Sequence, residues 1–251
     1  MNTQLDGRTA LVTGSTGGIG VGIARALAGA GAFVVVSGRD EQRGAEVVAK
    51  LVADGGRATF VRADLAGGCA SVRDLAAAAV AAAGGQVDVL VNNAAQLIDP
   101  AATPEVPESA IASALAINVA APFLLTGLLV PAMVERGWGA VVNIGSMNGV
   151  VGMARSALYS ATKAAVHSLT LSWSAEFAAA GVRVNTVAPG PTATSFNLER
   201  EQLLAPIIAQ IPSGQMSTVD DVGAAVVFLA SDAARNIHGA TLSVDGGYTA
   251  V

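Results

Sequence analysis

The sequence predicts an α/β fold in which helices cover both faces of a parallel β-sheet. The hydrophobic fraction is high, at 52%, while the aromatic fraction is only 4%, and the surplus consists of Ala, Val and Leu. Strands buried on both faces and small-residue helices require this composition. Short apolar stretches also alternate with helical patterns along the chain. No linker-like segment divides the 251 residues, so we expect one domain over residues 1–251.

Seven stretches have the short apolar pattern of buried strands: residues 9–13, 33–37, 58–62, 87–91, 140–144, 182–188 and 241–244. Helical spacing is expected after the glycine cluster at 14–20, at 41–53, from near residue 71, at 108–135, from Tyr159 to about 180, and at 218–230. Residues 195–217 form an apolar insert with prolines at 206 and 212. At the carboxyl end of a sheet, such a breakable segment is predicted to be a substrate lid.

Charge and rare residues exclude several classes of protein. The net charge of −5, with no basic cluster, disfavours nucleic acid and acidic membranes as partners. The single Cys69 excludes an internal disulfide framework, and His167 and His238 lack the spacing of metal ligands. The N-terminus lacks the apolar core of a signal peptide, and the apolar run 119–134 is too short to cross a bilayer. We therefore expect a cytoplasmic protein without a metal.

The first strand pattern leads into a glycine cluster, Gly14-Ser15-Thr16-Gly17-Gly18-Ile19-Gly20, and then into a helix. A strand, a glycine turn and a helix together form the phosphate-binding start of a dinucleotide fold, because glycines let the backbone approach the pyrophosphate. The spacing Gly14-x-x-x-Gly18-x-Gly20 differs from the standard nucleotide fingerprint. A tight turn without a ligand is the alternative, and the flanking strand and helix weigh against it.

The end of the second strand bears on the choice of cofactor. Arg39 follows it, and the first carboxylate is Asp40. An arginine can bind a 2′-phosphate, whereas a carboxylate binds the ribose 2′-hydroxyl of NAD. We predict NADP, with NAD through Asp40 as the alternative.

Three polar positions follow strand ends or interrupt an apolar helix. Asp64, followed by Leu65, either accepts a hydrogen bond from an adenine-type amine or caps the next helix. Asn92 and Asn93 end the fourth strand and are expected to satisfy nearby backbone groups. Asn118 is either a satisfied core amide or a polar link between the active site and water. Pro122, four residues later, is expected to bend this helix.

The expected chemistry lies between Ser146 and Lys163. Tyr159 and Lys163 are four residues apart, so on a helix they share a face. An ammonium beside a phenol favours the phenolate, so we expect a lowered tyrosine pKa and a group suited to proton transfer. Ser146 follows the fifth strand, so its hydroxyl can point at the substrate oxygen to which the tyrosine transfers a proton. The three groups suit a carbonyl being reduced or an alcohol being oxidised.

A packed ring beside a solvated charge would give the same pair of residues. The chain has only two lysines and two tyrosines, so their chance placement four residues apart is uncommon. The redox interpretation therefore depends on the cofactor site.

Together these residues resemble the short-chain dehydrogenase/reductase family, in its single-domain branch, over essentially the whole chain. The features that carry the resemblance are Thr13-Gly14-x-x-x-Gly18-x-Gly20, Asp64, Asn92-Asn93-Ala94, Asn118, Ser146, Tyr159-x-x-x-Lys163 and Pro189-Gly190. The resemblance implies a three-layer, doubly wound Rossmann-type fold with a seven-stranded parallel sheet, a nicotinamide cofactor, and dimers or tetramers. Ala95, where the family usually has glycine, and Pro191-Thr192 depart from the pattern.

The resemblance also implies roles for individual residues. Tyr159 would transfer the proton, Lys163 would lower its pKa and hold the nicotinamide ribose, Ser146 would position the substrate oxygen, and Asn118 would join a water-linked proton relay. The expected cofactor-binding residues are Gly14, Ser15, Gly18, Ile19, Gly20, Arg39, Asp64, Leu65, Asn92, Ala94, Tyr159, Lys163, Pro189, Gly190, Thr192 and Thr194.

The resulting hypothesis is an NADP-dependent oxidoreductase that interconverts a ketone and a secondary alcohol. A 3-oxoacyl-thioester reductase and a sugar or polyol dehydrogenase both fit. The few Lys and Arg residues argue mildly against docking an acidic carrier protein, although Arg136 and Arg155 could serve. The alternative from another class is a nucleotide-binding regulatory protein without turnover.

Overall fold

The computed structural model describes residues 4–251 and contains one seven-stranded parallel sheet, in the order β3-β2-β1-β4-β5-β6-β7. The strands are β1 (Thr9–Val12), β2 (Phe33–Gly38), β3 (Arg57–Arg62), β4 (Val89–Asn92), β5 (Gly139–Ile144), β6 (Val182–Pro189) and β7 (Thr241–Val244). The sheet confirms the predicted fold class.

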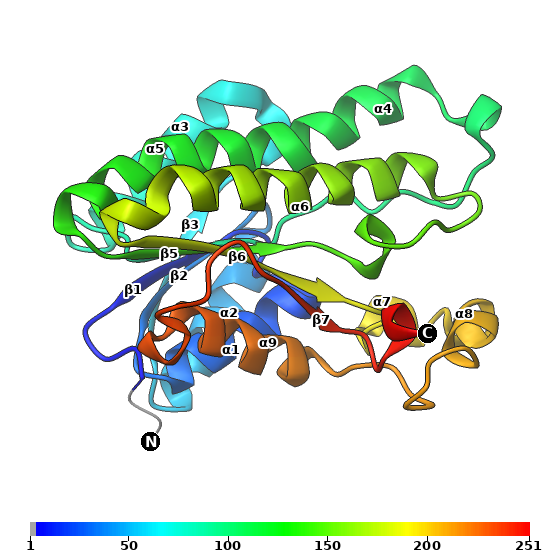
Figure 1. The fold of residues 1–251 in the computed structure, drawn as a ribbon. Helices are drawn as coiled ribbons and strands as arrows, with labels where there is room; N and C mark the ends of the chain where they lie inside the picture. Colours follow the sequence, from blue (N-terminus) through cyan, green and yellow to red (C-terminus); the bar gives the residue numbers. More distant parts are fainter. Residues whose placement is uncertain (1–3) are drawn as a thin grey trace.

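Nine α-helices lie within the described residues: α1 (Gly18–Gly29), α2 (Glu41–Ala53), α3 (Gly68–Ala82), α4 (Glu108–Leu115), α5 (Ala121–Arg136), α6 (Ala157–Phe177), α7 (Ser195–Leu198), α8 (Glu201–Ile208) and α9 (Val219–Ala230). Figure 1 shows α3, α4, α5 and α6 on one face of the sheet and α1, α2 and α9 on the other. Thr218 caps α9, as predicted, with its hydroxyl accepting from the Asp221 N–H at 3.1 Å.

Alternating strand residues fill the two cores. In β1, Ala10 and Val12 pack toward α1 and α9, whereas Leu11 packs toward α3 and α5. Leu11 pairs in register with Val35 of β2 and Leu90 of β4. The inner strands β1, β4, β5 and β6 are buried along their whole length, whereas the edge strands β3 and β7 are partly exposed.

Two helical stretches are apolar and long enough to cross a membrane by length and composition, Leu65–Ala82 and Glu108–Arg136. Both lie in the layer that covers one face of the sheet, and their buried residues belong to its core. Packing against the strands buries 28% of the first stretch and 44% of the second, and so accounts for part of their hydrophobicity.

The predicted long helix at 108–135 is interrupted. Between α4 and α5, Ala116–Ala120 form a π-helical turn, η3, and Pro122 lies in the first turn of α5. Pro122 has no N–H to donate to the carbonyl of Asn118, so the regular ladder cannot continue there. The expected disruption is present, in the form of a π turn with Asn118 at its centre.

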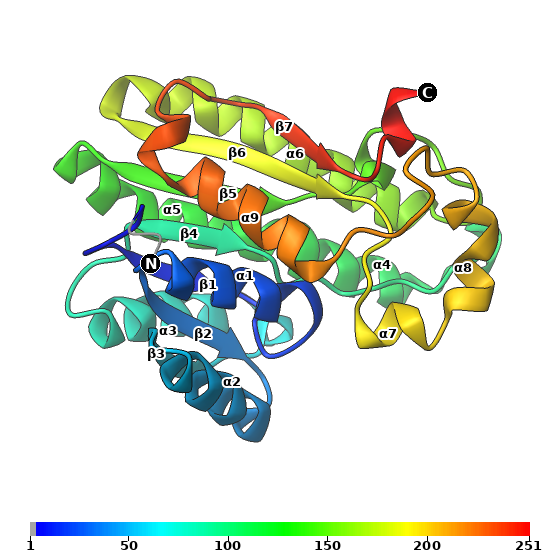
Figure 2. The ribbon, with the colours of Figure 1, turned by 90° about the horizontal axis from the view of Figure 1, so that it is seen from below.

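The insert at 195–217 contains the short helices α7 and α8. Figure 2 shows both beyond the carboxyl ends of the strands, beside the end of β6. Several of its large apolar side chains are exposed, among them Leu203 at 77%. The insert thus lies at the sheet edge where the site residues gather.

Candidate active site

The glycine turn lies at the carboxyl ends of β1 and β4, where the strand order reverses. Open α/β sheets bind ligands at this point. Gly14 and Gly18 have φ values of 63° and 52°, a region that favours glycine. Gly18, Ile19 and Gly20 form the first turn of α1, which no side chain within residues 4–251 caps. Their N–H groups have no partner within the helix, so this turn fits an anionic pyrophosphate.

The close packing of the turn explains why glycines occupy positions 14 and 20. A Cβ on Gly14 would lie 2.8 Å from the Ala94 Cα, and a Cβ on Gly20 would lie 2.3 Å from the Gly14 carbonyl oxygen. The Ser15 hydroxyl donates to the Val12 carbonyl at 2.7 Å and accepts from the Ser37 N–H at 3.0 Å. Ser15 was predicted to bind the cofactor, but its side chain joins β1 to β2 and its N–H donates to the Ser37 carbonyl at 2.9 Å. A cofactor contact of Ser15 stays a prediction.

Two residues without a predicted cofactor role shape the other side of this turn. The Thr13 hydroxyl accepts from the N–H groups of Asn93 and Ala94 at 3.0 Å each. The Asn93 amide donates to the carbonyls of Thr13 and Gly14 at 2.8 and 3.1 Å. Asn93 therefore satisfies backbone groups as predicted. Thr13 belongs to the motif that carries the family resemblance, but the partners of its hydroxyl could not be read from the sequence, because they lie about 80 residues away.

Asn92 has a different environment from Asn93. Its amide is buried and donates to Asn143 Oδ1 at 2.9 Å and to the Thr126 hydroxyl at 3.4 Å. Asn143 in turn donates to the Thr170 hydroxyl at 2.8 Å. The expectation that Asn92 would satisfy the backbone is wrong for its side chain, which joins a polar network inside the helical layer. The side-chain oxygen of Asn92 is buried and has no hydrogen-bond partner among residues 4–251, and its contact with a cofactor stays a prediction.

Arg39 and Asp40 are separated by the structure. Asp40 caps α2: one carboxylate oxygen accepts from the Arg43 N–H at 3.0 Å, and the other lies 3.4 Å from Arg43 Nε. The Arg39 side chain is exposed and makes no hydrogen bond or ion pair with residues 4–251. Its backbone carbonyl is held by Arg62 Nε at 3.2 Å. Arg39 is therefore the available cation at the end of β2, while the carboxylate is engaged.

Asp64 is exposed, and its carboxylate accepts from the Ala66 N–H at 3.0 Å, which caps the 3₁₀ turn η1 (Leu65–Gly67). Its carbonyl accepts from the Ser71 hydroxyl. Of the two alternatives, capping is therefore observed, although of η1 rather than directly of α3. Leu65 is buried between the sheet and α3. Their contacts with an adenine group stay a prediction.

The Ser146–Lys163 residues converge at the end of β5. Ser146 follows β5, and its hydroxyl accepts from the Asn148 N–H at 3.2 Å, which caps the 3₁₀ turn η4 (Met147–Gly149). Tyr159 lies in the first turn of α6, with Lys163 one turn later. The Lys163 ammonium is buried, donates to the Ile144 carbonyl at 2.8 Å and lies 5.7 Å from the centre of the Tyr159 ring. Lysine and tyrosine thus face the same strand end, as predicted from their spacing.

The prediction that the pKa of Tyr159 is lowered is wrong for the protein alone. Burial raises the pKa of the phenol above its ordinary value, and a hydrogen bond with the Ser146 side chain opposes this rise only in part. Burial also lowers the pKa of Lys163 to about 8. Desolvation therefore decides the direction of the Tyr159 shift, while the Lys163 ammonium is bound to the Ile144 carbonyl. At neutral pH the phenol keeps its proton, as a proton donor to a carbonyl oxygen requires.

Asn118 lies in the π turn η3 and links two parts of the site. Its side-chain oxygen accepts from the Gln96 N–H at 2.7 Å, and its amide donates to the Gln96 carbonyl and the Thr162 hydroxyl, each at 3.2 Å. The Thr162 hydroxyl donates to the Tyr159 carbonyl at 2.8 Å. The amide is thus satisfied and joins the loop after β4 to the Tyr159 turn. A water-linked relay stays a prediction.

The segment after β6 borders the cofactor turn. A Cβ on Gly190, which follows Pro189, would lie 2.9 Å from Asp245 Cα. Thr192 is buried, and its hydroxyl donates to the Gly190 carbonyl at 3.0 Å. Thr194 caps α7, and its methyl group would lie 3.6 Å from a Cβ on Gly18. The structure thus brings the post-β6 segment next to the first turn of α1.

The two arginines considered for carrier docking are both engaged. Arg136 donates to the Val87 carbonyl at 2.9 Å and pairs with Asp88 at 3.5 Å, at the amino edge of the sheet. Arg155 pairs with Glu105 at 3.3 Å. Arg136 is therefore at the wrong edge to guide a carrier to Tyr159.

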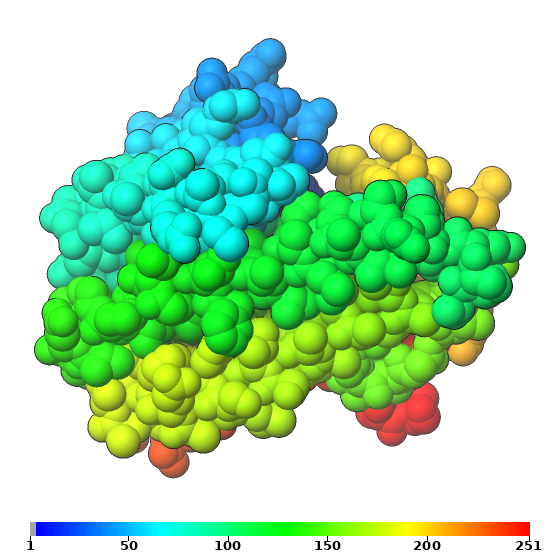
Figure 3. All heavy atoms as spheres, turned by 90° about the horizontal axis from the view of Figure 1, so that it is seen from above, coloured from blue at the N-terminus to red at the C-terminus, as the bar shows by residue number. Residues whose placement is uncertain are grey.

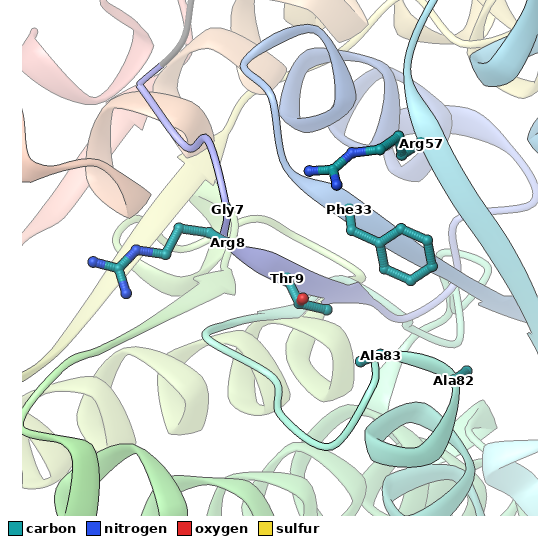
Figure 4. A pocket seen from close by; sticks show the side chains of 7 residues that line it. All are labelled: Gly7, Arg8, Thr9, Phe33, Arg57, Ala82 and Ala83. Carbon is teal, nitrogen blue, oxygen red and sulfur yellow. The ribbon is translucent and has the colours of Figure 1, made fainter.

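A surface cavity of about 280 Å³ also lies at the amino edge, away from these residues. Its lining consists of Gly7, Arg8, Thr9, Phe33, Arg57, Ala82 and Ala83 (Figure 4). Arg57 donates to the Gly31 carbonyl, and Arg8 turns away from Phe33 and stacks 3.5 Å from the centre of the Trp138 ring. Both cations are thus engaged, and the cavity is on the opposite side from the expected chemistry.

Comparison with known proteins agrees with this geometry. A family model described as enoyl-(acyl carrier protein) reductase matches residues 14–249. Galactitol 2-dehydrogenase (L-tagatose-forming) from Cereibacter sphaeroides is 40% identical, over 98% of this chain and 96% of that protein.

Two solved structures are also similar. The first is described as an NAD(P)-dependent gluconate 5-dehydrogenase from Beutenbergia cavernae with bound NADP; it is 39% identical, with a TM-score of 0.93, over 100% of both chains. The second is a 3-oxoacyl (acyl-carrier-protein) reductase from Agrobacterium tumefaciens C58 with NADP bound. It is 37% identical, with a TM-score of 0.92, over 97% of this chain and 95% of that one.

The family match over almost the whole chain, the relatives and the glycine turn beside Ser146, Tyr159 and Lys163 agree with one another. This chain belongs to the short-chain dehydrogenase/reductase family.

Proposed function

We propose that this protein is an NADP-dependent oxidoreductase that interconverts a ketone and a secondary alcohol, with Tyr159 as the general acid and base. The observation that carries the proposal is the convergence of Ser146, Tyr159 and buried Lys163 beside an uncapped glycine turn. The NADP bound in two similar structures supports the choice of cofactor.

The chain's own residues would hold the cofactor at three places. The turn from Gly14 to Gly20 would bind the pyrophosphate, Arg39 the 2′-phosphate, and Lys163 the nicotinamide ribose. When bound, a nicotinamide group supplies or accepts the hydride. Arg39 suits a phosphate because its guanidinium forms paired, charge-assisted hydrogen bonds.

The proposed catalysis depends on the positions of two side chains. The Ser146 hydroxyl hydrogen-bonds the substrate oxygen and orients it toward the Tyr159 phenol. During reduction, the phenol donates its proton to that oxygen as the carbonyl carbon is reduced, and during oxidation it takes the proton back. The raised pKa of Tyr159 keeps the donor form present at neutral pH.

We further propose that the substrate is a small free hydroxy or keto compound, of the sugar or polyol kind, rather than a carrier-bound acyl thioester. The position of Arg136 supports this choice, since this arginine pairs with buried Asp88 at the amino ends of the strands, away from Tyr159. The residues proposed to line the substrate space are Met147, Asn148, positions 95–98 and the insert at 195–217. This insert would act as a lid, with its exposed apolar side chains closing over the substrate.

The test of function is the absorbance of NADPH in the presence of a panel of ketones, and of NADP⁺ with the matching alcohols. Sugar ketones, polyols and a 3-oxoacyl thioester belong in the panel. Turnover of sugar-type compounds is expected. Turnover of the thioester alone would refute the proposed substrate class, and cofactor binding without any turnover would favour a regulatory nucleotide-binding protein.

Arg39→Asp is expected to weaken NADP binding by roughly tenfold to a hundredfold, because hydrogen bonds to a charged group contribute about 1.5–3 kcal/mol. Fluorescence titration with NADP⁺ and NAD⁺ measures the change. Arg73→Asp, an exposed site on α3, is the matched control and should leave both affinities as they are. Unchanged NADP affinity in Arg39→Asp would show that this residue does not bind the 2′-phosphate.

The proposed assembly is a homodimer or homotetramer formed through the helical face of α4, α5 and α6. Figure 3 shows α5 and α6 side by side on this face. Phe123 on α5 and Leu171 on α6 are 53% and 62% exposed, and Leu115 and Leu128 on the same helical layer are also exposed. We infer that a partner covers these side chains. A monomeric mass in sedimentation would contradict this assembly.

The proposed location is the cytoplasm, where a nicotinamide cofactor is present. The exposed, unpaired Cys69 is compatible with a reducing compartment. Fractionation of the producing cells would test this, and recovery with the membranes or in the medium would contradict it.

A further inference from the structure

A third residue continues the Tyr159–Lys163 spacing on α6. His167 follows Lys163 by four residues, so the three side chains lie along one face of the helix. The proposed reaction uses Tyr159 and Lys163 but not His167. The imidazole instead contacts the backbone that carries Ser146.

Side chains of α6 hold the backbone on either side of Gly145. Lys163 Nζ donates to the Ile144 carbonyl at 2.8 Å, and the Ser146 N–H donates to His167 Nε2 at 3.4 Å. The Gly145 N–H is bound to the Val187 carbonyl at 2.8 Å. Three successive residues at the end of β5 are therefore each held by a different hydrogen bond.

Two glycines let the Ser146 loop lie directly on the imidazole. A Cβ on Gly145 would lie 2.1 Å from His167 Nε2, and a Cβ on Gly149 would lie 2.9 Å from His167 Cε1. Any larger residue at Gly145 would have to displace either the ring or the loop. The ring thus supports the turn from which the Ser146 hydroxyl projects.

This contact requires a neutral histidine. Nε2 can accept from the Ser146 N–H only without its own proton, so Nδ1 carries the hydrogen. Burial lowers the pKa of His167, and the positive charge of Lys163 lowers it further. Lys163 and, two turns away, Tyr159 are the titratable groups on its own helix face. The groups that border it from β5, η4 and β6 are the uncharged Gly145, Ser146, Gly149 and Thr186.

We propose that His167 is a positioning residue that holds the Ser146 hydroxyl in its catalytic place by accepting a hydrogen bond from the Ser146 backbone. Protonation turns the acceptor nitrogen into a donor and removes this support. Turnover therefore declines as the pH falls below the range in which His167 is neutral. The inference rests on the proposed function, because it assigns His167 a role in the same site.

The test compares His167→Gln with His167→Leu in the enzyme bound to NADPH, using the ketone that it reduces fastest. The glutamine side-chain oxygen can accept from the Ser146 N–H at any pH, whereas leucine fills the space without accepting. We expect His167→Leu to lower kcat by roughly tenfold, since losing a hydrogen bond and its alignment costs about that factor. NADP affinity should stay the same. We expect His167→Gln to keep most of the kcat and to lose the acid limb of the pH profile.

Wild-type kcat and an unchanged acid limb in His167→Leu would overturn the inference. If the leucine variant does not fold, His167→Gln decides alone: an acid limb identical to that of the wild type refutes the role of His167. A second readout does not need turnover, namely the exchange rate of the Ser146 amide proton as a function of pH. Protection that is lost on acidification in the wild type but not in His167→Gln supports the contact. Protection independent of pH in both refutes it. If the enzyme shows no turnover but the amide protection is lost on acidification in the wild type and kept in His167→Gln, the proposed function is refuted and the contact between His167 and Ser146 still holds.

Discussion

Tyr159→Phe is expected to lower kcat by about 10³-fold, within the range that a positioned general acid contributes. The phenylalanine ring fills the same space at the start of α6 but has no proton to give to the substrate oxygen. The Ser146 hydroxyl and the glycine turn are unaffected, so the affinity for NADP should change little. Steady-state rates and cofactor titration on the same preparation measure the two quantities.

Tyr248→Phe is the matched control, because Tyr248 is the only other tyrosine and lies in the C-terminal 3₁₀ turn η7 (Tyr248–Ala250). It should keep the wild-type kcat. Comparable rates for Tyr159→Phe and the wild type would exclude Tyr159 as the acid. Loss of cofactor binding together with rate would instead show that its role is mainly structural.

Lys163→Met is expected to remove activity and at the same time to stabilise the cofactor-free protein. Burial lowers the pKa of Lys163 from 10.5 to about 8, which corresponds to a cost of about 3 kcal/mol for keeping the charge in the folded state. Methionine removes this cost but leaves the buried Ile144 carbonyl without its donor, a loss of about 1–3 kcal/mol. We therefore expect the free energy of unfolding at neutral pH to rise by up to about 2 kcal/mol, the difference of the two.

The dependence of the free energy of unfolding on pH shows independently that the buried charge of Lys163 destabilises the fold. Below about pH 8, Lys163 is protonated in both the folded and the unfolded chain, so the full cost of burying its charge applies. Between about 8 and 10.5 the folded chain has lost the proton and the unfolded chain still binds it, so the stability of the wild type rises with pH. This contribution should be missing in Lys163→Met.

Urea unfolding across this pH range measures both effects. Lys50→Met on the exposed side of α2 is the control, since it replaces the only other lysine, and it should leave the curve unchanged. A Lys163→Met variant less stable than the wild type at neutral pH would show that the Ile144 hydrogen bond outweighs the burial of the charge.

Local pattern was sufficient for most of the fold. The helix predicted at 41–53 is α2 with the same bounds, and the strand predicted at 241–244 is β7. Hydrophobic periodicity and capping residues act within a few positions of one another, so they can be read from the chain directly. The helix at 108–135 was predicted as continuous with a bend, because a π turn has no periodic signal of its own.

The spacing of Tyr159 and Lys163 and the glycines of the first turn were recognisable for the same reason. Each motif is local, and its geometry follows from a helix or a strand–turn–helix unit. The choice between Arg39 and Asp40 as the cofactor-binding residue could not be made from the sequence. It depends on the hydrogen bond that the Asp40 carboxylate accepts from the Arg43 N–H, which occupies Asp40 and not Arg39.

The amino-acid sequence by itself determined the layers of the fold and the residue types that meet at the carboxyl edge of the sheet. The tertiary structure decided which of those groups are free and how they are charged. Ser15 and Asn92 are engaged by residues of other strands, His167 lies under Ser146, and the Tyr159 pKa is raised rather than lowered. Burial and long-range hydrogen bonds cause these outcomes, and both depend on segments that folding alone brings together.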